Sequence, residues 1–211
     1  ILSPEKQCGK TTLLSVIGCL VPKPLHAANI TAAAVFRTIE HIQPTLLIDE
    51  ADTFLPGADE LRGVLNSGHN RATAYTVRLV GDKHEPKQFS TWTPVAIAAI
   101  GTLKDTLMDR SIIVQMRRRM ASEYVDRFRI DRVKHLSRLS SMCARWAADN
   151  LHKLPDIDPE ISNGLSDRAA DNWRPLLAIA QLAGGYWPDK AMTAMFALNQ
   201  PNADADGASI G

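Results

Sequence analysis

The sequence predicts an α/β fold with a parallel sheet, followed by an all-helical part. Up to about residue 119, short apolar runs alternate with helical patterns. Such runs are typical of strands buried on both faces, and the alternation is typical of parallel sheets with helical crossovers. From Met120 onward, apolar residues recur at helical spacing with charges between them.

The composition is that of a folded domain. The chain has 211 residues, 45% of them apolar, with 24 Lys and Arg against 23 Asp and Glu. A disordered chain would be less apolar, and no apolar run reaches the roughly 18 residues of a membrane span. A net charge of +1 excludes a strongly basic nucleic-acid coat protein, although not a local basic patch.

The three cysteines and the first residues bear on the cellular context. The odd cysteine count fits neither a disulfide framework nor a zinc pattern and indicates a reducing, cytoplasmic compartment. The chain begins with Ile1 and shows no signal peptide. We therefore expect it to be part of a longer protein.

Local signals divide the first part, residues 1–119, into elements. Prolines end the first two helices, Thr31 is the expected N-cap of the second, and the turn residues of 81–86 join two alternating strands. The expected order is a strand end at 1–3, a loop at 4–9, a helix at 10–20, a strand at 26–29, a helix at 32–42, a strand at 45–48, a helix at 58–67, a hairpin over 74–93 with strands at 75–80 and 87–92, and buried strands at 95–100 and 111–116.

The helical part is expected over residues 120–199. It divides into helices at 120–153, 167–183 and 188–198, a linker at 155–164 and a break near Pro175. Trp173 and Trp187 are expected in its core. Residues 200–211 are small and polar, and we expect a disordered tail there.

A phosphate-binding motif stands between the first strand and the first helix. Such a loop needs backbone N–H groups at a helix N-terminus, a Lys for the β- and γ-phosphates and a hydroxyl for Mg²⁺. Gly9, Lys10 and Thr11 supply the end of this motif, whereas Pro4 stands where the full pattern has its first Gly. The predicted nucleotide-binding residues are Lys6, Gln7, Cys8, Gly9, Lys10, Thr11 and Thr12.

An acidic pair gives the second signal. Asp49 and Glu50 follow the apolar run 46–48 directly. In nucleoside triphosphatases the Asp completes the metal shell and the Glu activates water. The two motifs in this order predict an ATPase with ATP and Mg²⁺ as cofactors. Lys10 and Glu50 would be catalytic, and Thr11 and Asp49 would hold the metal.

Residues 49–52 spell the tetrapeptide of DEAD-box RNA helicases. Those helicases have far more chain between the two motifs, and they carry a second recA-like domain for which this chain has no room. The order of phosphate loop, acidic pair, buried strand, arginine and helical part instead resembles the AAA+ superfamily.

A closer resemblance rests on five stretches: 3–14, 47–52, 65–69, 109–112 and 167–173. Together they look like a bacterial family of P-loop ATPase domains of uncharacterised function, found in phage and mobile-element proteins and often joined to primase or zinc-binding modules. The resemblance implies a P-loop core with a helical lid at 120–199, a helicase-like role in DNA replication, and DNA and a primase module as partners.

The resemblance also implies roles for single residues. Arg110 matches an arginine finger that reaches the nucleotide of a neighbouring subunit, which implies a homo-oligomeric ring. Arg168 is the candidate lid arginine, with Arg174 second. Thr102 stands near the sensor-one position, where the superfamily usually has Asn. Asn29 is a candidate restraint on the Glu50 side chain.

Two basic regions are candidates for nucleic-acid contact. The hairpin 74–93 carries Arg78, Lys83, His84 and Lys87, of which the two lysines suit phosphate contacts. The run 117–119 suits phosphate or acidic residues of a neighbour. The alternative for both regions is ordinary exposed charge, and the histidines lack metal-ligand spacing.

Cys8 gives a chemical expectation of its own. It lies in the loop at a helix N-terminus, which favours the thiolate. We expect alkylation of Cys8 to block nucleotide binding and ATP to protect it.

Two other functions share the same motifs. An ATP-driven loader or remodeller of proteins would use the same core without unwinding a duplex. A nucleotide-binding regulatory module without turnover is favoured by Pro4 and Thr102, whereas Glu50 argues against it.

Overall fold

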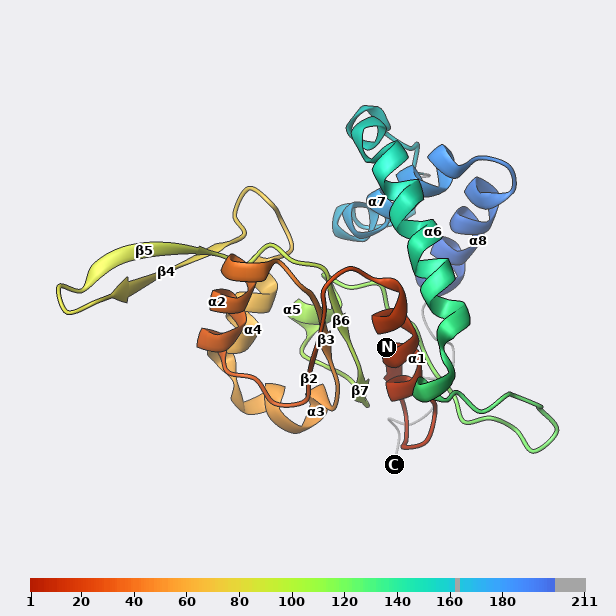
Figure 1. Ribbon diagram of the computed structural model, residues 1–211, viewed down its shortest axis with the longest axis horizontal. Coiled ribbons are helices and arrows are strands. Elements are labelled where there is room, and N and C mark those ends of the chain that lie inside the picture. Colours follow the sequence, from red (N-terminus) through yellow and green to blue (C-terminus); the bar gives the residue numbers. More distant parts are fainter. Residues whose placement is uncertain (162–163, 200–211) are drawn as a thin grey trace. The chain divides into compact units, whose positions relative to one another are not determined.

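The computed structural model describes residues 1–161 and 164–199 and falls into two compact units (Figure 1). Unit 1 comprises Ile1–Arg110 and Val114–Asp149, and unit 2 comprises Ser111–Ile113 and Asn150–Gly211. The chain passes to the second unit near residue 150 rather than at the expected boundary of 119. The expected tail, 200–211, lies outside the described residues.

Parallel strands form the centre of unit 1. They are β1 (Leu2–Ser3), β2 (Pro24–Ala27), β3 (Thr45–Ile48), β6 (Val95–Ile97) and β7 (Ala99–Ile100). β3 pairs with both β2 and β6, and β1 pairs with β7. On the other edge of β1, Leu2 forms a parallel bridge with Gln115. The order across the strands is therefore residue 115, β1, β7 with β6, β3 and β2, which confirms the α/β prediction with parallel pairing.

Three strand predictions need correction. The expected strand 95–100 is interrupted at Ala98, whose N–H donates to the Ile48 carbonyl at 2.8 Å. The expected strand 111–116 is reduced to the bridge at Gln115, because its partner β1 has two residues and Pro4 offers no N–H to extend the pairing. β2 begins two residues early, since an edge strand accepts a proline as its first residue.

The three helices expected in the α/β part are confirmed, and two short helices that the sequence analysis did not predict, at 51–54 and 105–108, accompany them. They are α1 (Lys10–Leu20), α2 (Ala32–Ile42), α3 (Ala51–Phe54), α4 (Asp59–Ser67) and α5 (Asp105–Met108), with a 3₁₀ turn η1 (Leu55–Gly57). The Ala34 N–H donates to Thr31 Oγ1 at 3.2 Å, so Thr31 caps α2 as predicted. In Figure 1, α1 lies on one side of the strands and α2 and α4 on the other.

The core of unit 1 forms where helices cover β3. All four residues of β3 are buried. Leu14 of α1 packs with Leu47 and Ala98 on one side of the strands, and α2 buries Val35, Phe36 and Ile39. Burial of β3 on both faces holds the chain firmly where the strand ends, at Asp49.

The hairpin between β3 and β6 is confirmed, with a tighter turn. Strands β4 (Tyr75–Val80) and β5 (Glu85–Ser90) pair antiparallel and project from unit 1 (Figure 1). Gly81 and His84 have φ of 69° and 51°, so four residues reverse the chain instead of the expected six. At its base the buried Phe89 packs on Phe36 with ring centroids 4.9 Å apart.

The helix expected from residue 120 begins only at Lys134. Residues 116–129 are irregular, followed by the 3₁₀ turn η2 (Ile130–Arg132), α6 (Lys134–Asn150) and the 3₁₀ segment η3 (Leu151–Asp156). Met120 and Tyr124 are 56% and 88% exposed. A helix there would find no surface against which to bury its apolar side chains, and an isolated helix of that length is marginal in water.

Unit 2 packs two long helices, α7 (Asp167–Ala183) and α8 (Trp187–Asn199). Trp173, Leu177 and Met195 form its buried core. The predicted break near Pro175 is wrong, because α7 continues through that residue. The buried side chains of Trp173 and Leu177 flank Pro175 and offset the roughly 3 kcal/mol that a proline costs inside a helix.

The described part of the chain contains no helix with the length and apolar character needed to cross a membrane.

A glycine at the end of α4 provides a test of this packing. A Cβ on Gly68 would lie 2.5 Å from the Thr91 carbonyl oxygen, whereas a Cβ on Gly63, inside the same helix, meets nothing within 4 Å. Gly68→Ala should lower the free energy of unfolding by roughly 1–3 kcal/mol. Gly63→Ala should raise it by up to about 1 kcal/mol, because Ala is the better helix former. Urea unfolding measures both, and equal effects would contradict this packing.

Candidate functional site

The loop between β1 and α1, residues 4–9, has an unusual backbone. Gln7 and Gly9 both have left-handed φ, at 65° and 85°. Two such residues close together make a tight turn into α1, and glycine adopts this conformation without a steric penalty. Gly9 caps α1 with no side-chain bond, so the first N–H groups of the helix are available to an anion.

Lys10 folds back onto this loop. Its Nζ donates to Ser3 Oγ at 2.5 Å and to the Glu5 carbonyl at 3.4 Å. Ser3 is buried and its hydroxyl also donates to the Glu5 carbonyl, at 2.7 Å. The ammonium therefore rests on oxygen acceptors of the loop that a phosphate group can replace.

The acidic pair occupies the turn after β3. The Asp49 N–H donates to the Ala27 carbonyl at 2.9 Å, which continues the β2–β3 pairing. Glu50 has a left-handed φ of 52° and is exposed, and its N–H donates to Asp49 Oδ1 at 2.9 Å. A non-glycine residue held in this strained conformation requires support from its surroundings, and such residues cluster at functional sites.

The last residue of β7 and the residue after it connect the two motifs. The Ile100 N–H donates to Asp52 Oδ1 at 2.8 Å, two residues after Glu50. The next residue, Gly101, donates its N–H to the Ser3 carbonyl at 2.9 Å, at the start of the loop. The structure thus brings the loop and the acidic turn to the same carboxyl edge of the parallel strands.

The donors present suit Mg²⁺. Thr11 is exposed in the first turn of α1, next to Thr12, and Asp49 is partly exposed. A hydroxyl and a carboxylate are hard oxygen ligands, and Mg²⁺ takes its remaining ligands from water and phosphate. The described residues hold no group of three or more His, Cys, Asp or Glu side chains that forms a metal site.

Three other predicted site residues make no described contact with the loop 4–9: Arg110, Thr102 and Asn29. Arg110 follows α5 and donates from Nη1 to the Thr106 carbonyl at 2.6 Å, while half-buried. Thr102 is exposed two residues after β7. Asn29 is exposed two residues beyond the end of β2, whereas it was expected at the end of that strand. Within the described part of the chain, none of the three is hydrogen-bonded to Lys10 or Glu50.

Arg118 belongs to the run 117–119, and its contact with the loop 4–9 was not predicted from the sequence. Its guanidinium pairs with Glu5 Oε2 at 2.9 Å and donates to the Lys6 carbonyl at 3.2 Å. The bridge at Gln115 sets the following residues beside β1, so the chain passes along the loop. Met116 Cε lies 3.7 Å from where a Gly9 Cβ would be. The arginine run 117–119 is evident in the sequence, but its contact with Glu5 and Lys6 of the loop depends on the tertiary structure.

The hairpin cations have partners within the chain. Arg78 pairs with Glu60 at 2.7 Å and lies over the Phe36 ring at 5.3 Å. Lys87 lies 4.9 Å from the Phe89 ring centroid. Lys83 and His84 are at the exposed tip. Arg78 therefore joins the hairpin to α2 and α4, whereas Lys87 contacts a ring of the hairpin itself.

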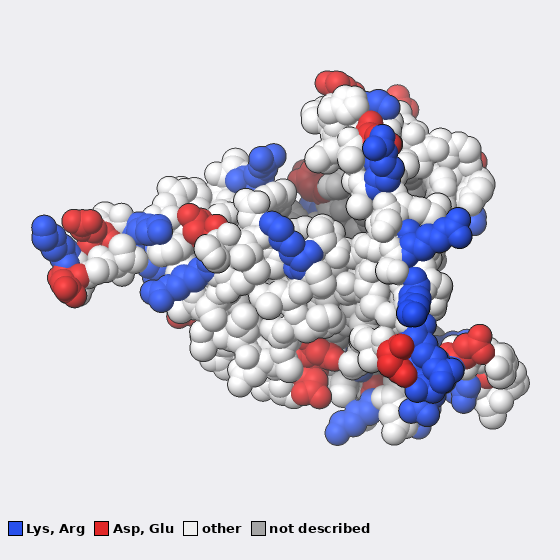
Figure 2. Space-filling model, in the orientation of Figure 1, with Lys and Arg blue, Asp and Glu red and all other residues white. Residues whose placement is uncertain are grey.

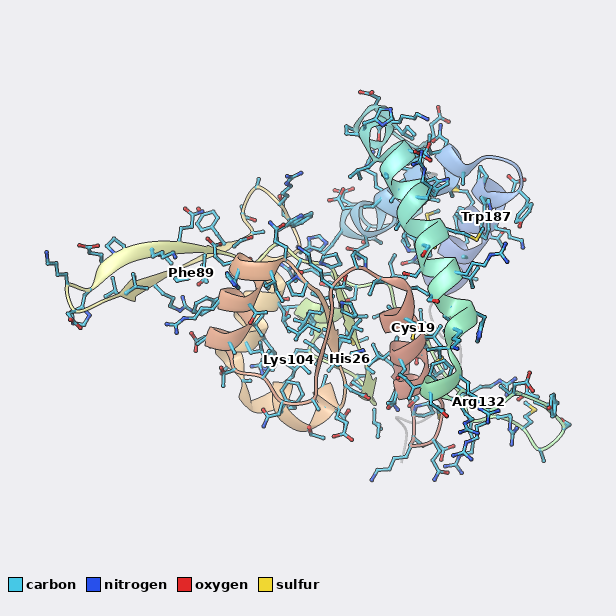
Figure 3. The ribbon with its side chains drawn as sticks, viewed as in Figure 1. Cys19, His26, Phe89, Lys104, Arg132 and Trp187 are labelled. Carbon is cyan, nitrogen blue, oxygen red and sulfur yellow. The ribbon has the colours of Figure 1, made fainter. Side chains whose placement is uncertain are left out.

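The predicted lid residues belong to unit 2. Arg168 is the second residue of α7 and exposed, and Arg174 forms an ion pair with Asp158. Trp173 is buried, as predicted. The prediction for Trp187 is wrong: it is 50% exposed, and its ring lies 5.1 Å from that of Tyr186. Figure 3 shows Trp187 at the end of α8.

Cys8 is packed into the loop. It is 5% exposed, and its thiol donates to the Lys6 carbonyl at 3.8 Å. Burial of the sulfur restricts the access of reagents to Cys8, and the expected block of nucleotide binding by its alkylation stays a prediction.

Comparisons with known proteins give one family model, matched by the C-terminal part of the chain, and a relative that is similar over part of its length. Residues 115–211 match the model of a family described as "Protein of unknown function (DUF3631)". The chain is 40% identical over 97 residues to an "Uncharacterized 28.9 kDa protein in xis 5'region" of Saccharopolyspora erythraea. That match covers 45% of this chain and 36% of the relative. The chain therefore spans about a third of the length of this relative.

The ion pair between Arg117 and Glu123 gives a prediction about the pKa of the carboxylate. The Arg117 guanidinium, followed by the Met120 N–H, lowers the pKa of Glu123 from 4.5 to about 2. We call the contacts of Glu123 with Arg117 and the Met120 N–H the clamp. Because the pKa of Glu123 is depressed in the folded chain, the stabilisation by this clamp is complete above about pH 4.5 and is lost as the pH falls toward 2. A ¹³C NMR titration should give Glu123 the low value. Arg117→Ala should return it toward 4.5.

Arg119→Ala is the matched control, because Arg119 makes the smallest contribution to the Glu123 pKa. An ordinary pKa for Glu123 in the unaltered chain would contradict the clamp.

The cysteines give a second prediction. Cys143 is exposed and Cys8 is buried. A thiol reagent should modify Cys143 rapidly and Cys8 slowly, and Cys143→Ser should remove the rapid phase. Mass spectrometry of timed samples identifies the modified residue, and rapid modification of Cys8 would show that the loop opens readily.

Proposed function

We propose that the chain is an ATP-hydrolysing motor domain of helicase-like type with a P-loop, AAA+-like core. The observation that carries this proposal is the common edge shared by the loop 4–9 and the Asp49–Glu50 turn. Ligands of open α/β sheets bind beyond the carboxyl ends of the strands, where the strand order switches direction. β1 is such a position, since residue 115 flanks it on one side and β7 on the other.

Each residue of the site has a task that its position allows. Lys10 exchanges Ser3 Oγ and the Glu5 carbonyl for β- and γ-phosphate oxygens. Loop and helix N–H groups bind the remaining phosphate oxygens. Glu50 accepts the proton of the attacking water at its exposed carboxylate. Thr11 and Asp49 would hold Mg²⁺, which would supply positive charge against the charge that develops on the phosphates.

Arg110 completes the proposal. Its guanidinium stays ionised and would stabilise transition-state charge at the nucleotide of a neighbouring copy. This assigns a homo-oligomer, with Arg168 as the contact from the helical part.

The biological setting is part of the proposal. The relative from Saccharopolyspora erythraea is named for its place 5′ of xis, an excisionase region. We assign this chain to DNA replication of a phage or mobile element on that basis and on the sequence resemblance, with a primase module as partner.

A protein loader or remodeller is the second candidate, and the hairpin favours it. One face of β4 carries Tyr75, Val77 and Leu79, which are 46%, 51% and 64% exposed. An apolar face of this kind suits contact with a protein more than with phosphates. The chemistry of ATP hydrolysis is the same in both candidates.

Two variants test the ATPase. Glu50→Gln keeps shape and removes the base, so hydrolysis should fall roughly 10²–10⁴-fold while ATP still binds. Lys10→Ala should remove a phosphate contact and lower hydrolysis by about 10²–10³-fold. Phosphate release measures turnover and equilibrium dialysis measures ATP binding, each with and without single-stranded DNA.

The controls are Glu85→Gln and Lys153→Ala, which change exposed side chains of the same types outside the site. Hydrolysis that survives Glu50→Gln would reject the assigned base. Tight ATP binding without any turnover would favour the regulatory module, and turnover that ignores DNA would favour the protein remodeller.

A further inference from the structure

Residues 116–134, here called the arm, leave the strands beside the loop 4–9 and extend from unit 1 without regular helix until Lys134 (Figure 1). Their side chains are mostly exposed. The arm begins at the Gln115 bridge and returns to α6, so both of its ends are held while its middle projects.

Positive charge is concentrated on the arm and on α6. Between residues 117 and 145 there are nine Lys and Arg against three Asp and Glu, whereas the whole chain has 24 against 23. Figure 2 shows Lys and Arg gathered along this part of the surface. The rest of the chain is therefore net acidic, and the basic character belongs to this segment.

Several of these cations have no partner within the described residues. Arg117 and Arg129 pair with Glu123 and Asp131. The exposed side chains of this segment that make no ion pair or side-chain hydrogen bond with the described part of the chain are Arg119, Arg127, Arg132, Lys134 and Arg138. Unpaired exposed cations are available to the phosphates of a nucleic-acid backbone.

Exposed apolar groups are interspersed among the charged residues of the arm: Tyr124 and Val125 stand between Glu123 and Asp126, and Ile130 stands between Arg129 and Asp131. Tyr124 is 88% exposed, and Val125 and Ile130 are 60% and 66% exposed. An exposed aromatic ring among cations is the arrangement on which single-stranded bases stack while their phosphates are neutralised. Duplex readout needs a helix or a two-stranded ribbon for the major groove, and the irregular arm provides neither.

We propose that the arm binds single-stranded nucleic acid, with Tyr124 as stacking platform and Arg119, Arg127 and Arg132 as phosphate contacts. Arg118 connects the bound strand to the loop through Glu5 and the Lys6 carbonyl. The link to ATP turnover rests on the proposed function, whereas strand binding does not.

Strand binding is measured without nucleotide, on the full chain, with fluorescein-labelled dT20 and rU20 in anisotropy titrations at several salt concentrations. Tyr124→Ala should weaken binding roughly tenfold, and Tyr124→Trp should restore it. Arg127→Ala should reduce the slope of log K against log salt by about 0.7, as expected for one lost phosphate contact. The two probes separate DNA from RNA as the natural ligand.

Tyr75→Ala, which removes an exposed Tyr from the hairpin, is the matched control and should bind dT20 normally. Loss of binding in Tyr75→Ala with none in Tyr124→Ala would move the site to the hairpin and overturn the proposal. Failure of both probes to bind at low salt would also overturn it, as would equal competition by poly-glutamate, which would indicate an acidic protein partner.

The link to the loop has a separate readout. Arg118→Ala should leave dT20 affinity within a factor of about two and reduce the stimulation of ATP hydrolysis by dT20 several-fold. If the unaltered chain hydrolyses no ATP, the proposed function fails while the binding result stands. If stimulation survives Arg118→Ala, the connecting role is wrong.

Discussion

The structure depends on the pairing of a two-residue strand on both of its edges. On one side of β1 the Leu2 N–H donates to the Val114 carbonyl at 2.9 Å and the Met116 N–H donates to the Leu2 carbonyl at 2.7 Å. On the other side, Ala99 and Gly101 donate to the carbonyls of Ile1 and Ser3 at 3.1 and 2.9 Å. These bonds bring the loop, the end of β7 and the start of the arm together. Buried backbone groups require such partners, so loss of β1 would separate all three.

Elements with strong local signals were predicted correctly from the sequence. The limits of α1, α2, β3 and β4 agree with the expectation because prolines, a Thr cap and strict alternation define them within a few residues. The arm and the missing break at Pro175 depend on tertiary packing. A helical pattern at residues 120–133 finds no surface to cover, whereas α7 has one and continues through its proline.

In the candidate site too, residues in local motifs were predicted from the sequence, whereas contacts between distant parts of the chain were not. Lys10, Asp49 and Glu50 follow local motifs, and the structure brings their segments to one edge. The contact of Arg118 with Glu5 joins residues 113 positions apart, and only the pairing of β1 with Gln115 creates it. Sequence alone likewise left the hairpin charges open, since Arg78 finds its acceptor on α4 and its aromatic ring on α2.

The strength of the Arg118–Glu5 pair limits what it can transmit. Both side chains are about half exposed, at 52% and 51%, and exposed ion pairs contribute about 0–1 kcal/mol. A ligand that breaks the pair can therefore shift an equilibrium at the loop by only about fivefold through this contact. A larger effect has to pass through the backbone, where the Met116 N–H bond to Leu2 and the close approach of Met116 to Gly9 join the arm to the turn that opens α1. The Arg118–Glu5 pair would then account for a several-fold part of the coupling, and the β1 pairing would carry any larger part.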